Sequence, residues 1–405
     1  MHIAYFTNFY LPVVNGVVRS VQSFREALSA MGHNVFVFAQ EDDYEDTEPF
    51  IFRYPSLHLP LGVDIPTAVP VSPFVDQLIP KLKLDVIHTH HPVLLGQTAA
   101  TKARDYNLPL VFTFHTQYHE YTHYIPFPQE QVQEFLKSQV INWMREFMRK
   151  CQHIIIPSES MRSVLINEYG LVDKFTVIPT GIDITPYKKA DGAAVRAQWN
   201  GNDDKIIISA GRLAEEKNWV TLLEAFAIAQ KTLTNIRLVL LGDGPQAQAL
   251  HRLAGELEIT DRVTFVGKVP FEDIPNYLKA ADLFAFASIT ETQGLVTLEA
   301  MAAGLPVVAV DASGTRDILE DGKQGFLTQN DANDLANGII RLVEDSTLHG
   351  RFKTAALRTS RSYDNTRLAR KMLKVYEQAI IDKKNEQYVT VEDASAIPLE
   401  EKAVA

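Results

Sequence analysis

The sequence lacks the features that define several large classes of protein. Its 405 residues include one cysteine, Cys151, which excludes an internal disulfide and any zinc or iron–sulfur site built on cysteines. No apolar run approaches the roughly 20 residues that span a bilayer, because Glu299, Gly304 and Pro306 interrupt the longest candidate, residues 295–310. No basic segment precedes the first apolar residues, so we expect no signal peptide and a cytoplasmic location.

Basic residues are also in the minority. The chain has 39 Lys and Arg residues against 50 Asp and Glu residues, a formal net charge of −11. A broad nucleic-acid-binding surface is not expected at this balance, and we predict no nucleic-acid partner. Apolar residues make up 46% and charged residues 22% of the chain, which is ordinary for a globular protein with a sizeable core. The length favours two or three domains.

Apolar runs and amphipathic segments alternate along the chain. Residues 2–7 are typical of a buried strand, residues 17–31 of a helix and residues 35–39 of a second strand. The rhythm restarts after a break near residues 182–204, which predicts the α/β class with two doubly wound, Rossmann-like domains facing an interdomain cleft. From about residue 385 the helical pattern is lost, so residues 385–405 are expected to form a disordered tail. Further strands are expected at 85–88, 110–114, 153–156, 175–178, 205–210, 237–241, 263–266, 283–287 and 306–310.

A basic pair follows the strand expected at 205–210. Arg212 and Lys217 stand on the loop after this strand, and both can face a ligand. Arginine offers a planar fork of donors and lysine a point charge, a combination that suits a diphosphate. The alternative is a solvated surface loop on which the two side chains pair with Glu215 or Glu216.

Residues 291–307 are the most informative stretch. Gly294 permits a tight turn after the strand at 283–287, and the amino-terminal amides of the helix that follows can bind an anion. Glu291 and Glu299 are separated by about two helical turns, so both carboxylates can lie along one side and accept hydrogen bonds from sugar hydroxyls without a metal. The alternative is a pair of exposed acids on a surface helix.

Histidines gather at the ends of two consecutive expected strands. His88, His90 and His91 follow the first strand, and His115 and His119 follow the next. A metal site is one interpretation, but no carboxylate stands at ligand spacing, and we expect no metal. Two clusters at neighbouring strand ends favour contact with a ligand over a purely structural role.

Two glycine-containing turns are weaker signals. Gly16, in the loop after the first strand, lets backbone amides approach a phosphate, and residues 242–245, Gly-Asp-Gly-Pro, close another strand. Tight turns need glycines in any case, so both turns are also explained by structure alone. The chain has neither the G-x-G-x-x-G pattern of dinucleotide-binding domains nor a Walker A sequence.

Taken together, these motifs resemble family 4 of the retaining glycosyltransferases, which have the GT-B fold. The resemblance rests on Gly211-Arg212…Lys217-Asn218 and on Glu291-x7-Glu299 followed by Ala-Met-Ala-Ala-Gly-Leu-Pro-Val, and it extends to about residue 381. It implies a nucleotide-diphosphate sugar as co-substrate, transfer with retention of anomeric configuration, and no cofactor. It also implies an acceptor-side domain, residues 1–185, completed by a helix at 366–384, and a nucleotide-sugar-binding domain, residues 186–365.

The resemblance assigns roles to individual residues. Arg212 and Lys217 would neutralise the donor diphosphate and the charge that grows on the leaving group, Glu291 would hold sugar hydroxyls, and His115 would touch the donor sugar near the reaction centre. These four are the catalytic candidates. The donor-binding candidates are Gly16 near the diphosphate, Lys268 and Val269 at the base, Thr292, Gln293 and Gly294 beside the sugar, Leu295 and Val296 at the phosphate, and Glu299 at the ribose.

Three stretches resemble the subgroup of the family that glycosylates diacylglycerol and related membrane lipids, namely residues 88–96, 119–126 and 291–294. Two segments, 74–83 and 131–150, also combine apolar and basic residues in a helical pattern, as helices that lie on an anionic membrane do. The alternative is that both apolar stripes pack on a sheet. The membrane-facing candidates are Lys81, Lys83, Trp143, Arg145, Arg149 and Lys150.

The sequence therefore predicts a hexosyltransferase that moves glucose from UDP-glucose to a membrane lipid such as diacylglycerol, with peripheral contact on the inner face of the cell membrane. One alternative keeps the chemistry and changes the acceptor to a soluble sugar, polyol or polysaccharide intermediate. A sugar-nucleotide epimerase is a second alternative, which the basic pair combined with Glu-x7-Glu disfavours. A non-catalytic binding protein is a third.

Overall fold

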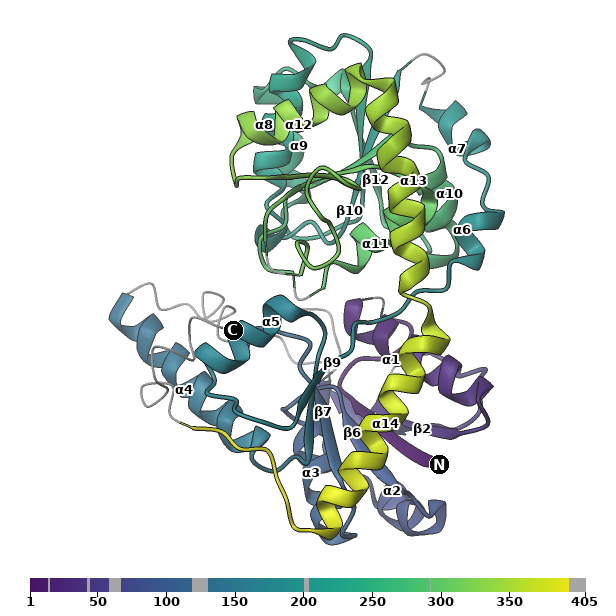
Figure 1. Ribbon diagram of the computed structural model, residues 1–405, viewed down its shortest axis with the longest axis vertical. Coiled ribbons are helices and arrows are strands. Elements are labelled where there is room, and N and C mark those ends of the chain that lie inside the picture. Colours follow the sequence, from purple (N-terminus) through teal and green to yellow (C-terminus); the bar gives the residue numbers. More distant parts are fainter. Residues whose placement is uncertain are drawn as a thin grey trace. The chain divides into compact units, whose positions relative to one another are not determined.

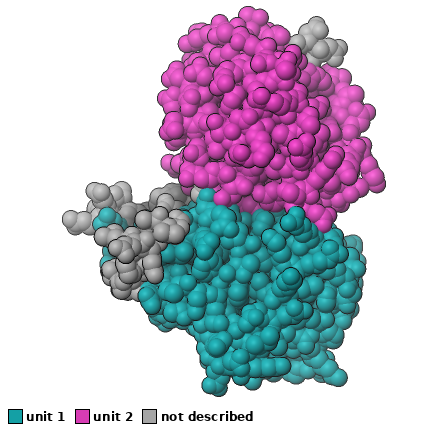
Figure 2. Space-filling model, in the orientation of Figure 1, with its two compact units in different colours: residues 1–181, 365–405 teal, residues 182–364 magenta. Residues whose placement is uncertain are grey.

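The chain divides into two compact units. The computed structural model describes residues 1–13, 15–41, 44–57, 67–118, 130–199, 204–291, 293–312 and 314–392. Unit 1 contains residues 1–181 and 365–405, and unit 2 contains residues 182–364 (Figure 2). The first boundary falls after Gly181 rather than after residue 185, because Ile182 pairs with Asp364 of unit 2.

Unit 1 is built on a parallel sheet of seven strands in the order β3-β2-β1-β6-β7-β8-β9, and a short antiparallel pair, β4 with β5, stands apart from it. Its strands are β1 (His2–Thr7), β2 (Asn34–Gln40), β3 (Ile51–Tyr54), β4 (Ser56–Leu57), β5 (Thr67–Ala68), β6 (Val86–Thr89), β7 (Leu110–Thr113), β8 (His153–Ile156) and β9 (Phe175–Val177). Its helices are α1 (Gly16–Ala30), α2 (Pro73–Leu78), the 3-10 helix η1 (Ile79–Leu82), α3 (Leu95–Asp105), α4 (Glu130–Met148), α5 (Glu159–Asn167) and α14 (Asn365–Lys384).

Alternating side chains along the strands of unit 1 bury both faces of the sheet. In β1, Ile3 and Tyr5 belong to the core that α1 and α14 cover, whereas Ala4 and Phe6 belong to the core on the other face. A parallel sheet covered on both faces needs apolar residues at nearly every position, which explains the continuous runs in the sequence. Figure 1 shows α14 lying along the sheet of unit 1, where it contacts α1, β6 and β7.

Unit 2 repeats the plan with six parallel strands in the order β12-β11-β10-β13-β14-β15. These are β10 (Lys205–Ala210), β11 (Ile236–Leu241), β12 (Val263–Gly267), β13 (Leu283–Phe286), β14 (Val307–Val310) and β15 (Gly325–Thr328). The α-helices are α6 (Thr185–Lys189), α7 (Ala193–Gln198), α8 (Trp219–Gln230), α9 (Ala247–Glu256), α10 (Ile274–Lys279), α11 (Leu295–Ala303), α12 (Ala332–Glu344) and α13 (Ser346–Ser362). Short 3-10 helices are η3 (Glu215–Lys217), η4 (Thr260–Arg262) and η5 (Phe271–Asp273). The predicted fold class is thus confirmed as two Rossmann-like domains.

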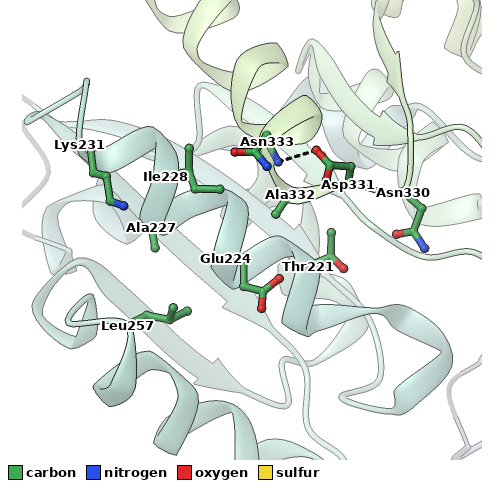
Figure 3. A pocket seen from close by; sticks show the side chains of 10 residues that line it. All are labelled: Thr221, Glu224, Ala227, Ile228, Lys231, Leu257, Asn330, Asp331, Ala332 and Asn333. Carbon is green, nitrogen blue, oxygen red and sulfur yellow. Dashed lines mark hydrogen bonds between the residues drawn. The ribbon is translucent and has the colours of Figure 1, made fainter.

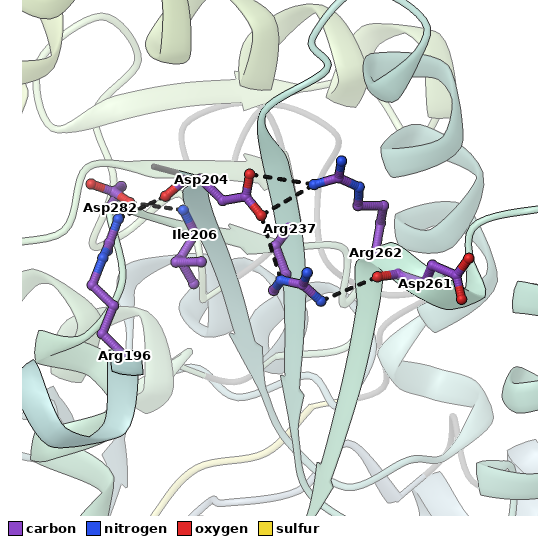
Figure 4. Close-up of polar contacts among 7 residues, drawn as sticks. All are labelled: Arg196, Asp204, Ile206, Arg237, Asp261, Arg262 and Asp282. Carbon is purple, nitrogen blue, oxygen red and sulfur yellow. Dashed lines mark hydrogen bonds and ion pairs between the residues drawn. The ribbon is translucent and has the colours of Figure 1, made fainter. Parts of the chain in front are cut away.

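An ion network ties together the amino ends of the strands of unit 2 (Figure 4). Asp282, just before β13, accepts hydrogen bonds from Arg196 at 2.9 Å and from the Ile206 amide at 2.7 Å. Asp204, just before β10, accepts a hydrogen bond from Arg262 at 3.1 Å. Parallel strands begin at one edge of a sheet and end at the other, so this network fastens the edge opposite to the carboxyl ends.

Two sequence expectations of the fold need correction. The helix expected at 74–83 is broken: α2 ends at Leu78, the 3-10 helix η1 follows, and Lys83 takes a left-handed φ of 49°. Pro80, inside this segment, cannot donate the hydrogen bond that an α-helix would need.

The tail expected to be disordered from residue 385 instead packs on unit 1 up to residue 392. The Val389 amide donates to the Cys151 carbonyl at 2.9 Å, and Leu171 and Val391 form an antiparallel bridge. Val389 and Val391 are buried while Thr390 is exposed, a strand-like alternation that the small and charged neighbours mask in the sequence. Residues 393–405 lie outside the described part of the chain.

Candidate active site

Each sheet has one point where its strand order reverses. In unit 1 this point lies between β1 and β6, and in unit 2 between β10 and β13. Open α/β sheets bind ligands outside the carboxyl ends of their strands at such switch points. The predicted His90 and His91 follow β6 and His115 follows β7, whereas Arg212 and Lys217 follow β10 and Glu291 follows β13. Each set therefore stands near the switch point of its own unit.

Glycines bring the loops of unit 2 close together. Gly242, after β11, has φ 135°, and a Cβ there would stand 1.9 Å from the Gly211 carbonyl oxygen. A Cβ on Gly244 would stand 2.5 Å from the Leu213 carbonyl oxygen. The Leu213 amide donates to the Asp243 carbonyl at 3.0 Å, which joins the two loops. Residues 242–245, a weak signal in the sequence, therefore support the loop that carries the basic pair.

Arg212 and Lys217 are both held by carboxylates. Arg212, whose side chain is 53% exposed, pairs at 2.5 Å with Glu216, whose side chain is 6% exposed. Lys217 ends the 3-10 helix η3 and pairs with Glu291. The sequence alternative, pairing with neighbouring acids, is thus true of Arg212 in this structure. The Arg212 fork is still open to solvent, and the paired carboxylate fixes where it stands.

Glu291 is the polar hub of this site. Its Oε1 atom accepts hydrogen bonds from Lys217 Nζ and from Ser288 Oγ, the latter at 2.8 Å. Ser288 is fully buried two residues after β13, and the Glu216 carbonyl, 3.3 Å from Oγ, is a second, more distant acceptor for the same hydroxyl hydrogen. Thr292, predicted beside Glu291, lies outside the described residues.

The start of α11 has the features of an anion site. Gly294 precedes the helix with φ 71°, a left-handed conformation that favours glycine. Leu295 and Val296 are the first two helical residues, and the amides of a first helical turn have no carbonyl partner within the helix. Thr297 and Thr315 are fully buried, and among the described residues their hydroxyls have no hydrogen-bond partner.

The remaining predicted residues of unit 2 differ in exposure. Glu299 lies in the second turn of α11 and is 3% exposed, and Gln293 is 4% exposed. Lys268, just after β12, is exposed, whereas Val269 is half-buried against the core of unit 2. Glu299 is therefore an almost inaccessible carboxylate in this structure, unlike the exposed acid of the alternative interpretation.

Unit 1 brings its two histidine groups into one buried cluster. His88, in β6, contacts the Tyr376 hydroxyl through Nδ1 at 2.8 Å and the Thr113 hydroxyl through Nε2 at 2.7 Å. His90 Nδ1 lies 3.0 Å from His115 Nε2. Burial lowers the pKa of all of these histidines, that of His115 to about 3, so each is neutral at pH 7.

His91 and Asn8 join β6 to the loop after β1. His91 Nδ1 accepts a hydrogen bond from the Asn8 amide at 3.1 Å, and burial lowers the pKa of His91 to about 3. Gly16 is the exposed first residue of α1, and Asn15 caps this helix by accepting from the Val18 amide at 2.9 Å. In the described part of the chain, no three His, Cys, Asp or Glu side chains are grouped to hold a metal ion. His119 lies outside that part.

Several residues of both sites were missed by the sequence analysis. Asn8 directly follows β1 and Ser288 comes two residues after β13, so the rule that polar residues at strand ends face ligands could have found them. Tyr376 and Thr315 carry no such signal. Tyr376 is separated from His88 by 288 positions, and only the folded chain brings the two together.

The membrane-facing candidates fall into two groups. Lys81, Lys83, Arg149 and Lys150 are exposed. Arg145 and Trp143 are half-buried: Arg145 donates from Nε to the Tyr169 carbonyl at 3.0 Å, and Trp143 packs against the core of unit 1. Arg149, although exposed, also donates to a backbone carbonyl, that of Val391, at 2.9 Å. Among the described residues, no helix is both long and apolar enough to cross a bilayer.

A surface hollow in unit 2 is separate from the predicted residues (Figure 3). It lies between α8 and the start of α12, where Asp331 accepts from the Asn333 amide at 2.9 Å. Its lining residues are Thr221, Glu224, Ala227, Ile228, Lys231, Leu257, Asn330, Asp331, Ala332 and Asn333. None of them is a candidate of the sequence analysis.

The fold and this site define the class. Two Rossmann-like domains with a basic pair, a carboxylate hub and a helix amino terminus at the switch point of unit 2 are the parts of a GT-B glycosyltransferase, which takes its sugar from a nucleotide donor. Residues 14–185 match the family described as Glycosyltransferase Family 4, and residues 193–359 match Glycosyl transferases group 1. The chain belongs to the family 4 glycosyltransferases and is a nucleotide-sugar-dependent hexosyltransferase.

Similar proteins agree with this assignment. The alpha-monoglucosyldiacylglycerol synthase of Acholeplasma laidlawii is 30% identical over 406 residues, covering 96% of this chain and 99% of that protein. The alpha-monoglucosyldiacylglycerol synthase of Streptococcus pneumoniae is 34% identical over 350 residues, covering 84% and 78%. In fold, the chain is similar to the Anabaena protein Alr3699/HepE, solved in complex with UDP and glucose, with a TM-score of 0.73 and 22% identity over 93% of this chain and 99% of that one.

Proposed function

We propose that the protein transfers glucose from UDP-glucose to the hydroxyl of a membrane lipid such as diacylglycerol, with retention of the anomeric configuration. The observation that carries the proposal is the similarity to two alpha-monoglucosyldiacylglycerol synthases at 30% and 34% identity, in one case over 96% of the chain. The geometry of unit 2 supports the donor half of the reaction.

In the proposed mechanism, Arg212 and Lys217 bind the donor diphosphate, and the amides of Leu295 and Val296 meet the same charge at the start of α11. Lys217 exchanges part of its contact with Glu291 for a phosphate oxygen. These groups favour departure of UDP because they stabilise the negative charge that grows on the leaving oxygen. Because Glu291 already holds the Lys217 ammonium group in place, little reorganisation is needed when the negative charge develops.

Glu291 holds the hydroxyls of the donor sugar, with Gln293 and Gly294 beside it. Lys217 and Ser288 hold its carboxylate in place through Oε1, and the sugar hydroxyls donate to this carboxylate. Glu299, in the second turn of α11, binds the ribose. The backbone of Lys268 and Val269 contacts the base. Gly16, which has no side chain, lets the backbone amides at the start of α1 approach the diphosphate.

Transfer takes place on one face of the sugar. The bond between C1 and the phosphate oxygen breaks, the lipid hydroxyl oxygen bonds to C1, and its proton passes to the departing phosphate. His115 touches the sugar near this centre and is neutral at pH 7, because burial lowers its pKa to about 3. A neutral imidazole can donate one hydrogen bond to the sugar without adding a charge.

Contact with the membrane is assigned to exposed basic residues of unit 1. Lys81 and Lys83 flank the end of η1, and Phe74 in α2 exposes 65% of its surface nearby in the sequence. Arg149 and Lys150 lie just after α4. Basic residues beside exposed apolar ones attract an enzyme to anionic lipid from one side, so we place the protein at the inner face of the cell membrane as a peripheral protein.

The experiment incubates the purified protein with UDP-glucose and vesicles of phosphatidylglycerol that contain or lack diacylglycerol. UDP release that depends on diacylglycerol, with a product heavier by one hexose, is the expected result. UDP release only with soluble sugars or polyols would overturn the lipid acceptor and keep the donor. Turnover of UDP-galactose or GDP-mannose but not UDP-glucose would overturn the donor.

A further inference from the structure

Three histidine rings form a continuous stack in the core of unit 1, and a tyrosine ring packs against its side. The ring of His88 lies 4.3 Å from that of His90, centroid to centroid, and the ring of His90 lies 5.3 Å from that of His115. The Tyr5 ring packs edge-on against both His88 and His90, at 5.1 and 4.9 Å. His88 and His90 are 0% and 1% exposed, so neither is placed to contact a ligand itself.

The stack is anchored at its inner end. The hydroxyls of Tyr376 and Thr113 hold both ring nitrogens of His88, at 2.8 and 2.7 Å, and Tyr5 contacts the Tyr376 hydroxyl at 3.1 Å. A ring held at both nitrogens cannot turn about its Cβ–Cγ bond without losing a hydrogen bond in a buried site. His90, which packs on this fixed ring, therefore has a fixed orientation as well.

At the outer end, His90 Nδ1 meets His115 Nε2 at 3.0 Å. Desolvation lowers the pKa of both rings well below the ordinary value, so the contact joins two neutral imidazoles. A neutral imidazole carries one hydrogen, on either Nδ1 or Nε2. One of the two rings must donate and the other must accept, and the choice decides which nitrogen of His115 carries its hydrogen.

The second nitrogen of His90 makes this choice. His90 Nε2 is buried and has no hydrogen-bond partner among the described residues. If Nε2 carried the hydrogen, a buried N–H would have no acceptor, which folded proteins largely avoid. The hydrogen therefore belongs on Nδ1 of His90, which donates to Nε2 of His115. His115 must then carry its own hydrogen on Nδ1.

We propose that His90 is a positioning residue for transfer: it holds the His115 imidazole through Nε2 and thereby presents the Nδ1–H of His115 to the sugar as a hydrogen-bond donor. The inference rests on the proposed role of His115 at the donor sugar. In the opposite tautomer, His115 would offer a lone pair to the sugar and could not stabilise charge on its oxygens. His88, held by Tyr376, contributes indirectly by fixing the orientation of His90.

The first test uses the wild-type chain. Ring-¹⁵N-labelled histidine reports which nitrogen of each imidazole carries hydrogen, and the His115→Asn variant identifies the signals of His115. We expect a protonated Nδ1 and an unprotonated Nε2 for His115 at pH 7.5. A protonated Nε2 would overturn the proposal, whether or not the enzyme transfers glucose. This measurement is independent of the donor, so it separates failure of this inference from failure of the proposed function.

The second test replaces the donor atom. His90→Phe keeps a buried ring and removes the hydrogen bond, and we expect kcat for UDP-glucose to fall about 10- to 100-fold, as for other orienting partners, with little change in KM. His90→Asn places an amide N–H where Nδ1 stands, and we expect it to restore kcat to within about threefold of wild type.

The matched control is His153→Phe. His153 is a buried histidine of β8 in the same sheet, and its Nε2 lies at hydrogen-bond distance, 2.9 Å, from the Thr176 hydroxyl, outside the stack. We expect this variant to keep wild-type kcat. Equal losses in His90→Phe and His90→Asn, or an equal loss in the control, would show that the residue serves packing alone and would overturn the proposal.

Discussion

Removing the charge of Lys217 tests the donor site most sharply. Its side chain is 23% exposed and pairs with Glu291, which is 14% exposed. An ion pair at this depth corresponds to an interaction of about 4 kcal/mol at an effective dielectric constant near 20. This pair fixes the position of the Lys217 ammonium group within unit 2. In Lys217→Met, kcat should fall about 10²- to 10³-fold, the usual loss when one group that stabilises the leaving charge is removed.

The fall in kcat is measured as initial UDP release from UDP-glucose with diacylglycerol vesicles. Lys231→Met is the matched control, because Lys231 is an exposed lysine just after α8 and lines the separate surface hollow of unit 2. Glu291→Gln should also lose activity. The double variant Lys217→Met/Glu291→Gln should lose less than the sum of the two single losses, since the two side chains share one interaction.

A kcat of Lys217→Met within threefold of wild type would refute this reasoning, as would an equal loss in Lys231→Met. Strict additivity of the Lys217 and Glu291 losses would refute the coupling. A loss confined to KM would mean that Lys217 binds the donor equally in the ground and transition states, against the proposed stabilisation of the leaving group.

Three further predictions concern stability, pH and membrane binding. Gly242→Ala should lower the free energy of unfolding, measured by urea titration, by at least about 3 kcal/mol because its Cβ would overlap a backbone oxygen. In the control Gly350→Ala, where the space around the new Cβ on α13 is open, the free energy of unfolding should rise by up to about 1 kcal/mol. The pKa of His91 falls from 6.5 to about 3 on folding, so the unfolded chain binds a proton at a higher pH than the folded chain does. The free energy of unfolding should therefore decrease as the pH drops below 6.5, by about 2 kcal/mol at pH 5. An equal decrease in His91→Asn would contradict this. Lys81→Gln/Lys83→Gln should weaken binding to anionic vesicles about 30-fold, at about 1 kcal/mol per basic residue, and unchanged co-sedimentation would argue against that surface.

Strands buried on both faces could be predicted from the sequence, because such strands are continuous apolar runs. Residues 205–210 and 283–287 are of this kind, and the structure has β10 and β13 there. The strand β15, Gly325–Thr328, could not be predicted in this way, because a glycine and a threonine leave it only two large apolar residues. The tail was misread because burial of Val389 and Val391 depends on contacts with residues far earlier in the chain.

The unit 2 site could be predicted in part, because Arg212 and Glu291 follow strands that turn out to be neighbours in the sheet. The pairing of Lys217 with Glu291 follows from that adjacency and is invisible in the sequence. The same holds for unit 1. The sequence indicates that His88, His90 and His115 stand at strand ends, but only the fold shows that Tyr376 of α14 holds the inner end of the stack.

The central claim, hexose transfer from a nucleotide sugar to a membrane lipid, is tested most directly by the structure of the product. The purified protein is incubated with UDP-[¹³C₆]glucose and diacylglycerol vesicles, and the lipid fraction is examined by mass spectrometry and by the one-bond coupling at the anomeric carbon. We expect a diacylglycerol that carries one labelled hexose in the α configuration of the donor. A β-linked product would contradict retention, and label found only in free glucose or in a soluble glycoside would contradict the lipid acceptor.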